Sequence, residues 1–151
     1  MLALLIGVVT GLRTAMPPAV LAWGVHRHWL DLHDSRLAFI GSTTAVVVLT
    51  VCALGELVVD KLPSAPNRTI VGGIVARVVL GGLSGAVIAT AGSQSAALGA
   101  LLGGAGGIAG AFGGLRARTG LVRALHVPDF VVACAEDAIA IGASVAIVAL
   151  L

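Results

Sequence analysis

The sequence predicts an all-α integral membrane protein with about five transmembrane helices. Of its 151 residues, 58% are hydrophobic and 11% are charged, whereas about a quarter of a soluble domain is charged. The mean hydropathy is +1.09. A helix needs about 20 apolar residues to cross roughly 30 Å of hydrocarbon, so the chain has room for five or six spans. We therefore expect residues 1–151 to form a single transmembrane helical domain.

The first apolar segment, Leu2–Trp23, is predicted to be a broken span. Pro17 and Pro18 remove two amide donors and move Met16 away from helical geometry. We expect two half-helices here, or a helix followed by an interfacial piece. The segment lacks a basic region before its apolar stretch and a small-residue cleavage site after it, so we interpret it as a span rather than a signal peptide.

Four further apolar segments are predicted as helices, because turn chemistry separates them. They are Leu37–Val59, Thr69–Ala91, Ser95–Leu115 and Phe130–Leu151. Two of them carry small residues at a spacing of four, which favours close packing of helices in a glycine zipper. These stripes are Gly73, Arg77, Gly81 and Gly85, and Gly99, Gly103, Gly107 and Ala111. Two such faces exceed what one small bundle needs, so we expect a homo-oligomer.

The pattern GxxxGLR occurs at residues 7–13 and again at 110–116. In a chain with 21 glycines, chance and a true duplication explain this about equally well. A true duplication would relate the first two spans to the last two as an inverted repeat, an arrangement that recurs in transporters.

Basic residues in the loops predict the orientation. The second and fourth loops carry Lys61, Arg68, Arg116, Arg118 and Arg123, whereas the first and third carry Arg27 and Arg36. The positive-inside rule then places the second and fourth loops in the cytoplasm. With five spans, the N-terminus is expected to be cytoplasmic as well.

Charges inside the apolar segments mark the candidate site. Glu56 and Asp60 lie one turn apart at the end of the second span, and Arg77 interrupts a packing stripe. Glu136 and Asp137 fall at a similar depth in the last span, so we expect these five side chains to meet in the inner third of the membrane. Acids outnumber bases in this set, and an unpaired carboxylate in low dielectric can carry a proton or bind a cation. Arg13 could close the site or snorkel to the outer interface.

The histidine-containing loop from His26 to Asp34 has no recognised metal-ligand spacing. Trp23 and Trp29 flank it, which favours an amphipathic segment at the interface.

The segments GLRTAMPPAVLAW, GELVVDKLPSAPNRT and AEDAIAIG resemble a family of small bacterial membrane proteins known only as a domain of unknown function. The resemblance implies the bacterial inner membrane. It implies no activity, substrate or cofactor.

Three functions remain open. The leading hypothesis is a transporter or channel that moves a proton, cation or small polar solute through the acid-rich site. The second is an intramembrane enzyme on a lipid or isoprenoid phosphate, with carboxylates on a divalent metal and Arg77 or Arg116 facing the phosphate. The third is a structural or assembly protein. We assign no catalytic residue and no cofactor, and expect membrane lipids and a small ion or solute, but no nucleic acid, as partners.

Overall fold

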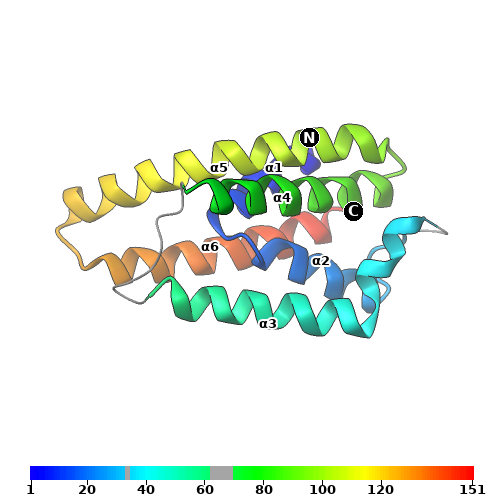
Figure 1. Ribbon diagram of the computed structural model, residues 1–151, viewed down its shortest axis with the longest axis horizontal. Helices are drawn as coiled ribbons and strands as arrows, with labels where there is room; N and C mark the ends of the chain where they lie inside the picture. The colour runs from blue at the N-terminus through cyan, green and yellow to red at the C-terminus, as the bar shows by residue number, and fades with distance from the viewer. Residues whose placement is uncertain (33–34, 62–69) are drawn as a thin grey trace.

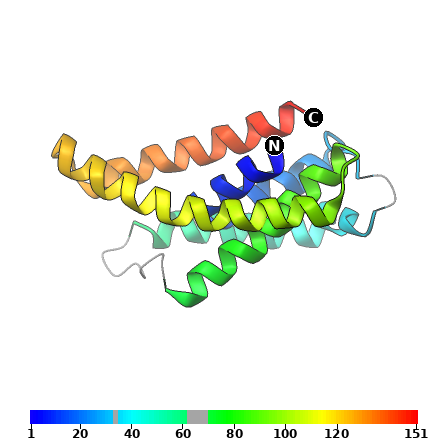
Figure 2. The same cartoon turned by 90° about the horizontal axis from the view of Figure 1, so that it is seen from above.

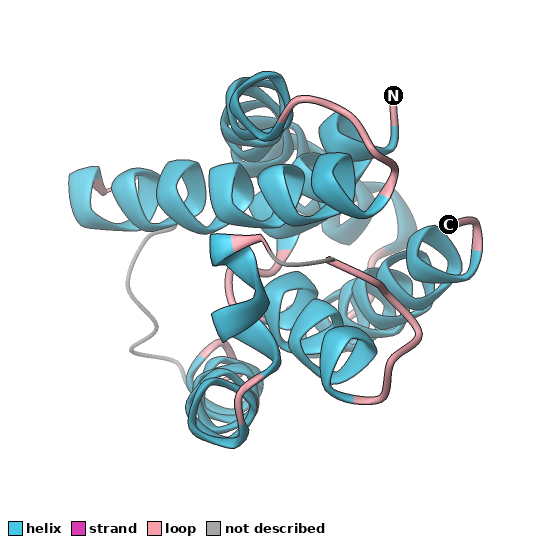
Figure 3. Ribbon diagram, turned by 90° about the vertical axis from the view of Figure 1, so that its right-hand side faces the viewer, coloured by secondary structure: helices cyan, strands magenta, loops and turns pink. Residues whose placement is uncertain are grey.

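The computed structural model describes residues 1–32, 35–61 and 70–151, and their regular structure is helical (Figures 1 and 3). The all-α prediction is confirmed. Arg68, Thr69, His33 and Asp34 lie outside the described residues. The elements are α1 (Leu2–Leu12), α2 (Met16–His26), the 3-10 helix η1 (Arg36–Gly41), α3 (Thr43–Val59), α4 (Val71–Ala91), α5 (Ala96–Leu125) and α6 (Asp129–Ala149).

Three of these helices, α4, α5 and α6, are long and apolar enough to cross a membrane. The apolar helices α1 and α3 are shorter, at 11 and 17 residues. Large apolar side chains such as Val51 and Leu101 are 63% and 73% exposed, which suits a protein solvated by lipid. The chain is a helical membrane protein.

Helix α5 continues ten residues beyond the predicted end at Leu115. Its 30 residues span about 45 Å, more than the hydrocarbon thickness of about 30 Å. Arg116, Arg118 and Arg123 are therefore on a helix that extends past the apolar layer, rather than in a loop.

The first segment is broken, as predicted, but at Arg13–Ala15 rather than at the two prolines. Pro17 and Pro18 lie in the first turn of α2, where a missing amide donor costs nothing because that amide has no partner in the helix. Met16 is accordingly helical, which corrects the expectation that proline would exclude it.

The two half-helices run in opposite directions, so the segment folds back on itself. Helix α1 is parallel to α5, because Gly7 lies against Gly103 and Gly11 lies against Gly107. Helix α2 is parallel to α6, since Arg13 contacts Ala133 near its start and Gly24 faces Val148 near its end. Figure 1 shows α5 and α6 antiparallel. We call the pair α1–α2 the hairpin, and Arg13–Ala15 its tip.

The hairpin changes the expected position of the N-terminus. The cytoplasmic prediction counted the first segment as a single crossing. In Figure 1 the N-terminus instead lies in the same half of the molecule as the C-terminus, away from the α5–α6 connection at the far left.

Glycines let three helices pack backbone to backbone. A Cβ on Gly85 would lie 2.8 Å from Gly103 Cα, and one on Gly110 would lie 2.9 Å from Gly11 Cα, closer than a side chain allows. Helix α4 crosses α5 at an angle in Figure 2, while α1 lies along the same glycine-rich helix. Both stripes are thus used within one chain, which removes the surplus packing surface from which the homo-oligomer was expected.

The two GxxxGLR segments do not behave as an inverted repeat. They lie in α1 and α5, which run in the same direction, whereas inverted copies would run in opposite directions. Their arginines also differ, because Arg13 is fully buried and Arg116 is exposed.

Candidate functional site: a charged hairpin tip

Arg13 is the centre of the site. It follows the last residue of α1 in an extended conformation, and its side chain is 0% exposed. The guanidinium is in contact with Asp60, which directly follows α3, and with Asp137 of α6 at 2.6 Å. It lies 3.3 Å from the carbonyl oxygen of Ala133 and 3.9 Å from Glu136. The arginine at the tip therefore joins the hairpin to two other helices, and the alternative that it snorkels to the interface is wrong.

Glu56 holds the start of α2. Its two carboxylate oxygens accept hydrogen bonds from the backbone amides of Thr14 at 2.7 Å and Ala15 at 2.8 Å. The first amides of a helix have no partner within the helix, and hydrocarbon offers no water to replace one. A carboxylate also suits the positive end of the helix dipole. Glu56 is thus a cap for the half-helix.

Arg77 performs the opposite task for α1. Its Nε donates to the carbonyl oxygen of Gly11 at 3.0 Å, and Nη1 donates to that of Gly73 at 3.0 Å. Gly11 lies in the last turn of α1, where carbonyls lack helical partners and the dipole favours a cation. Arg77 and Glu56 therefore stabilise the two sides of the break, with the charge that each side prefers.

Two further cations extend the cluster. Lys61 Nζ lies 2.9 Å from Asp137, and Arg118 Nη1 lies 3.6 Å from Glu136. Arg118 also pairs with Asp129, at 2.7 Å from Nε and 2.5 Å from Nη2. From the sequence, both cations were expected only as loop charges. Arg118 stands four residues after the buried Gly114, and this spacing could have placed it on the inward face.

The five side chains that were expected to meet are brought together only in part. Arg13, Asp60, Glu136 and Asp137 form one cluster, and Glu56 and Arg77 bind the backbone next to it. Arg116 is exposed and does not share the inward face of Arg118, so it is not a member.

The expected excess of acid is not found among the described residues. In the buried part of the site, Asp60, Glu136 and Asp137 face Arg13, Lys61 and Arg118, three acids against three bases, while the exposed Asp129 pairs with Arg118 at its edge. Hydrogen bonding is nevertheless incomplete in this part of the chain, since Arg13 Nε has no hydrogen-bond partner. The site is charge-balanced and tightly enclosed.

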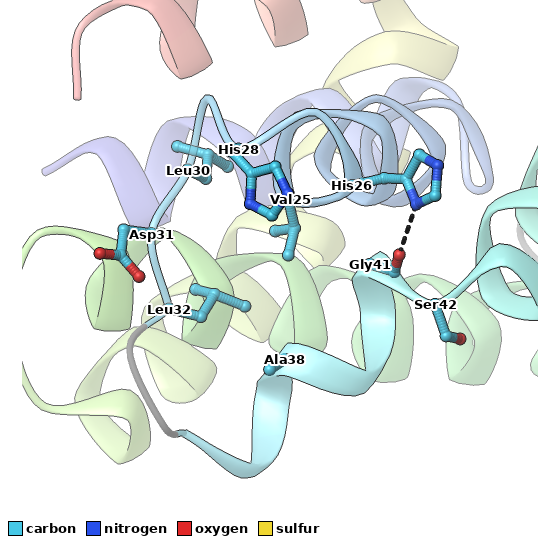
Figure 4. Close-up of a pocket in the computed structure, with 9 residues that line it drawn as sticks. All are labelled: Val25, His26, His28, Leu30, Asp31, Leu32, Ala38, Gly41 and Ser42. Carbon is cyan, nitrogen blue, oxygen red and sulfur yellow. Dashed lines mark hydrogen bonds between the residues drawn. The ribbon is translucent and has the colours of Figure 1, made fainter.

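A pocket of about 420 Å³ lies apart from the charged site, between the end of α2 and η1 (Figure 4). His26 Nδ1 is 2.8 Å from the carbonyl oxygen of Gly41, while Asp31 points away from both histidines that line the pocket. Within residues 1–32, 35–61 and 70–151, no three His, Cys, Asp or Glu side chains are placed to share a metal ion.

The comparisons bear on the whole chain. A family model described as "Domain of unknown function (DUF4126)" matches residues 1–150. No curated protein and no protein of solved structure matches. The chain therefore belongs to the DUF4126 family.

Proposed function

We propose that this protein is a small transporter or channel that moves a proton, cation or small polar solute past the hairpin tip. The observation that carries the proposal is the fully buried Arg13, held between carboxylates of other helices at a break in the membrane-embedded chain. Irregular backbone at membrane depth is tolerated where it is buried in protein or lines a cavity, and broken helices of this kind form the binding sites of many transporters.

The balance of acids and bases limits the classes of substrate that the site can bind. A bound cation would have to displace Arg13 or Lys61 from Asp137, whereas a neutral polar solute would leave these pairs in place. A proton would neutralise a carboxylate and release its arginine partner. We therefore favour a neutral polar solute over a proton or a metal cation, because only the neutral solute leaves the ion pairs in place.

The orientation follows from the basic end of the molecule. Lys61, Arg116, Arg118 and Arg123 belong to the end where α3 ends, α4 begins and α5 connects to α6, and we propose that this end faces the cytoplasm of a bacterium. Helices α3 to α6 then cross the inner membrane, and the hairpin enters from the opposite side, which puts the N-terminus outside.

The experiment is flux into proteoliposomes, with a pH-sensitive dye for protons and vesicle swelling for glycerol and urea. Asp137→Asn keeps the size of the side chain and removes its charge, so we expect flux to fall at least tenfold. Asp129→Asn is the matched control, because Asp129 also pairs with an arginine but is 61% exposed. Flux no greater than in empty liposomes, or equal flux in both variants, would refute the proposal.

A second candidate is a structural protein whose charges only fix the hairpin. The balanced ion pairs favour it, since such pairs can specify one arrangement of helices without binding anything. It predicts that Asp137→Asn lowers the melting temperature, while no flux is observed for any solute tested.

The lipid-phosphate enzyme has one supporting observation. A mostly apolar groove of about 150 Å³ lies between α5 and α6 and reaches Glu136 and Arg118. An acyl or isoprenoid chain could enter such a groove, and phosphate release from a lipid phosphate in mixed micelles tests this alternative.

The homo-oligomer stays a prediction. Analytical ultracentrifugation in mild detergent tests it, and a stable monomer that supports flux would count against it.

A further inference from the structure

One buried hydroxyl differs from the others in the core. Thr10 Oγ1 donates to the carbonyl oxygen of Ile6 at 2.8 Å, and Ser144 Oγ donates to that of Ala140 at 2.7 Å. Both bonds reach four residues back, which is how a hydroxyl in a helix usually satisfies itself. Ser84 is also 0% exposed, yet its Oγ, like that of the less buried Thr90, has no hydrogen-bond partner among the described residues. A buried polar group without a partner requires an explanation, and a bound water is the usual one.

Ser84 lies on the same side of α4 as the hairpin tip. It is seven residues after Arg77, two helical turns that bring it back to the same face and about 10 Å farther along the helix. The direction is away from the basic end of the molecule. Ser84 is therefore placed between the charged tip and the opposite membrane surface.

Two further buried hydroxyls belong to the same core. Val87 and Ile88, one turn from Ser84, belong to the same core cluster as Ile6 and Ala140, the residues to which Thr10 and Ser144 donate. The oxygens of Thr10 and Ser144 keep lone pairs that can accept from a water, and a buried water needs two to four polar partners.

We propose that Ser84 binds a water molecule on the route that links the hairpin tip to the opposite side of the membrane. The role of this water rests on the proposed transport function, but its detection does not. Water at Ser84 would continue the polar path beyond Arg77 through an otherwise apolar core.

The test is thiol labelling in a background with Cys52→Ala and Cys134→Ala. Ser84→Cys and the control Ala22→Cys both place a thiol at a position that is 0% exposed, and Ala22 lies in the apolar core. A small water-soluble methanethiosulfonate reagent reacts with thiolates, which form only in water. We expect Ser84→Cys to react at least tenfold faster than Ala22→Cys. Equal rates, or no reaction at Ser84→Cys, overturn the inference.

A second measurement decides the question if the cysteine variant does not fold. Ser84→Ala should raise the melting temperature if the hydroxyl is a dry, unsatisfied group, and should leave it unchanged or lower it if the hydroxyl holds water. A raised melting temperature overturns the inference. Labelling without flux in the wild type would refute transport alone, whereas flux without labelling would refute the water site alone.

Discussion

Replacing Arg13 tests whether the hairpin tip is the electrostatic centre of the fold. Arg13→Gln leaves the Asp60 and Asp137 carboxylates facing a neutral amide in a site where Arg13 itself has no exposure. Removing one partner of a buried ion pair costs about 3–5 kcal/mol, because the other charge stays buried without compensation. Lys61 still neutralises part of the charge on Asp137, so the lower end of this range is expected.

The assay is thermal unfolding in mild detergent. For a chain of this size, 1 kcal/mol corresponds to roughly 2–4 °C, so the melting temperature should fall by about 6–12 °C. Arg116→Gln is the matched control, since Arg116 ends the second GxxxGLR pattern but is exposed. It should change the melting temperature by less than about 2 °C, as surface substitutions usually do.

A double variant separates charge from packing. Arg13→Gln with Asp137→Asn removes one uncompensated carboxylate, so it should recover part of the stability lost in Arg13→Gln. If Arg13→Gln is as stable as the wild type, or if the double variant is less stable than the sum of the single variants, the charges do not hold the hairpin as described.

Three other predictions follow from the same geometry. Glu56→Ala removes both acceptors for the Thr14 and Ala15 amides and should lower the free energy of unfolding by about 1–2 kcal/mol in chemical denaturation. Glu56→Gln keeps one acceptor and should lower it less. Equal losses in the two variants would contradict the cap. Gly103→Ala places a Cβ 2.9 Å from Gly85 Cα and should lower stability by about 1–3 kcal/mol. Gly113→Ala has nothing within 4 Å among the described residues and should be neutral or slightly stabilising. The reverse order of the two stabilities would refute the packing. In intact cells that express a variant without Cys52 and Cys134, single cysteines at Leu2 and His28 should react with an impermeant thiol reagent added outside, and one at Lys61 should not. Protection at Leu2 would show that the hairpin is a single crossing.

The class of the protein and most of the charged residues of its site follow from the amino-acid sequence. Composition and segment length sufficed for an all-α membrane protein, because apolar runs of span length have no other stable form in a bilayer. Charges such as Arg13, Asp60 and Asp137 are too costly in hydrocarbon to lie apart, so their rarity alone indicated that they would meet. Spacing of four put the glycines of α4 and α5 on one face each.

How these parts are joined depends on long-range packing. A break after Leu12 permits either a continuing or a returning chain, and the choice depends on which surfaces α1 and α2 bury against α5 and α3. The opposite charges of Glu56 and Arg77 predict an ion pair between them, yet each side chain binds the backbone beside a different half-helix. Arg13 and Arg116 share a local sequence and differ in burial, because only Arg13 is at a helix end that contacts Asp60, next to α3, and residues of α6. Local sequence fixes which groups need partners, whereas long-range packing fixes which partners they find.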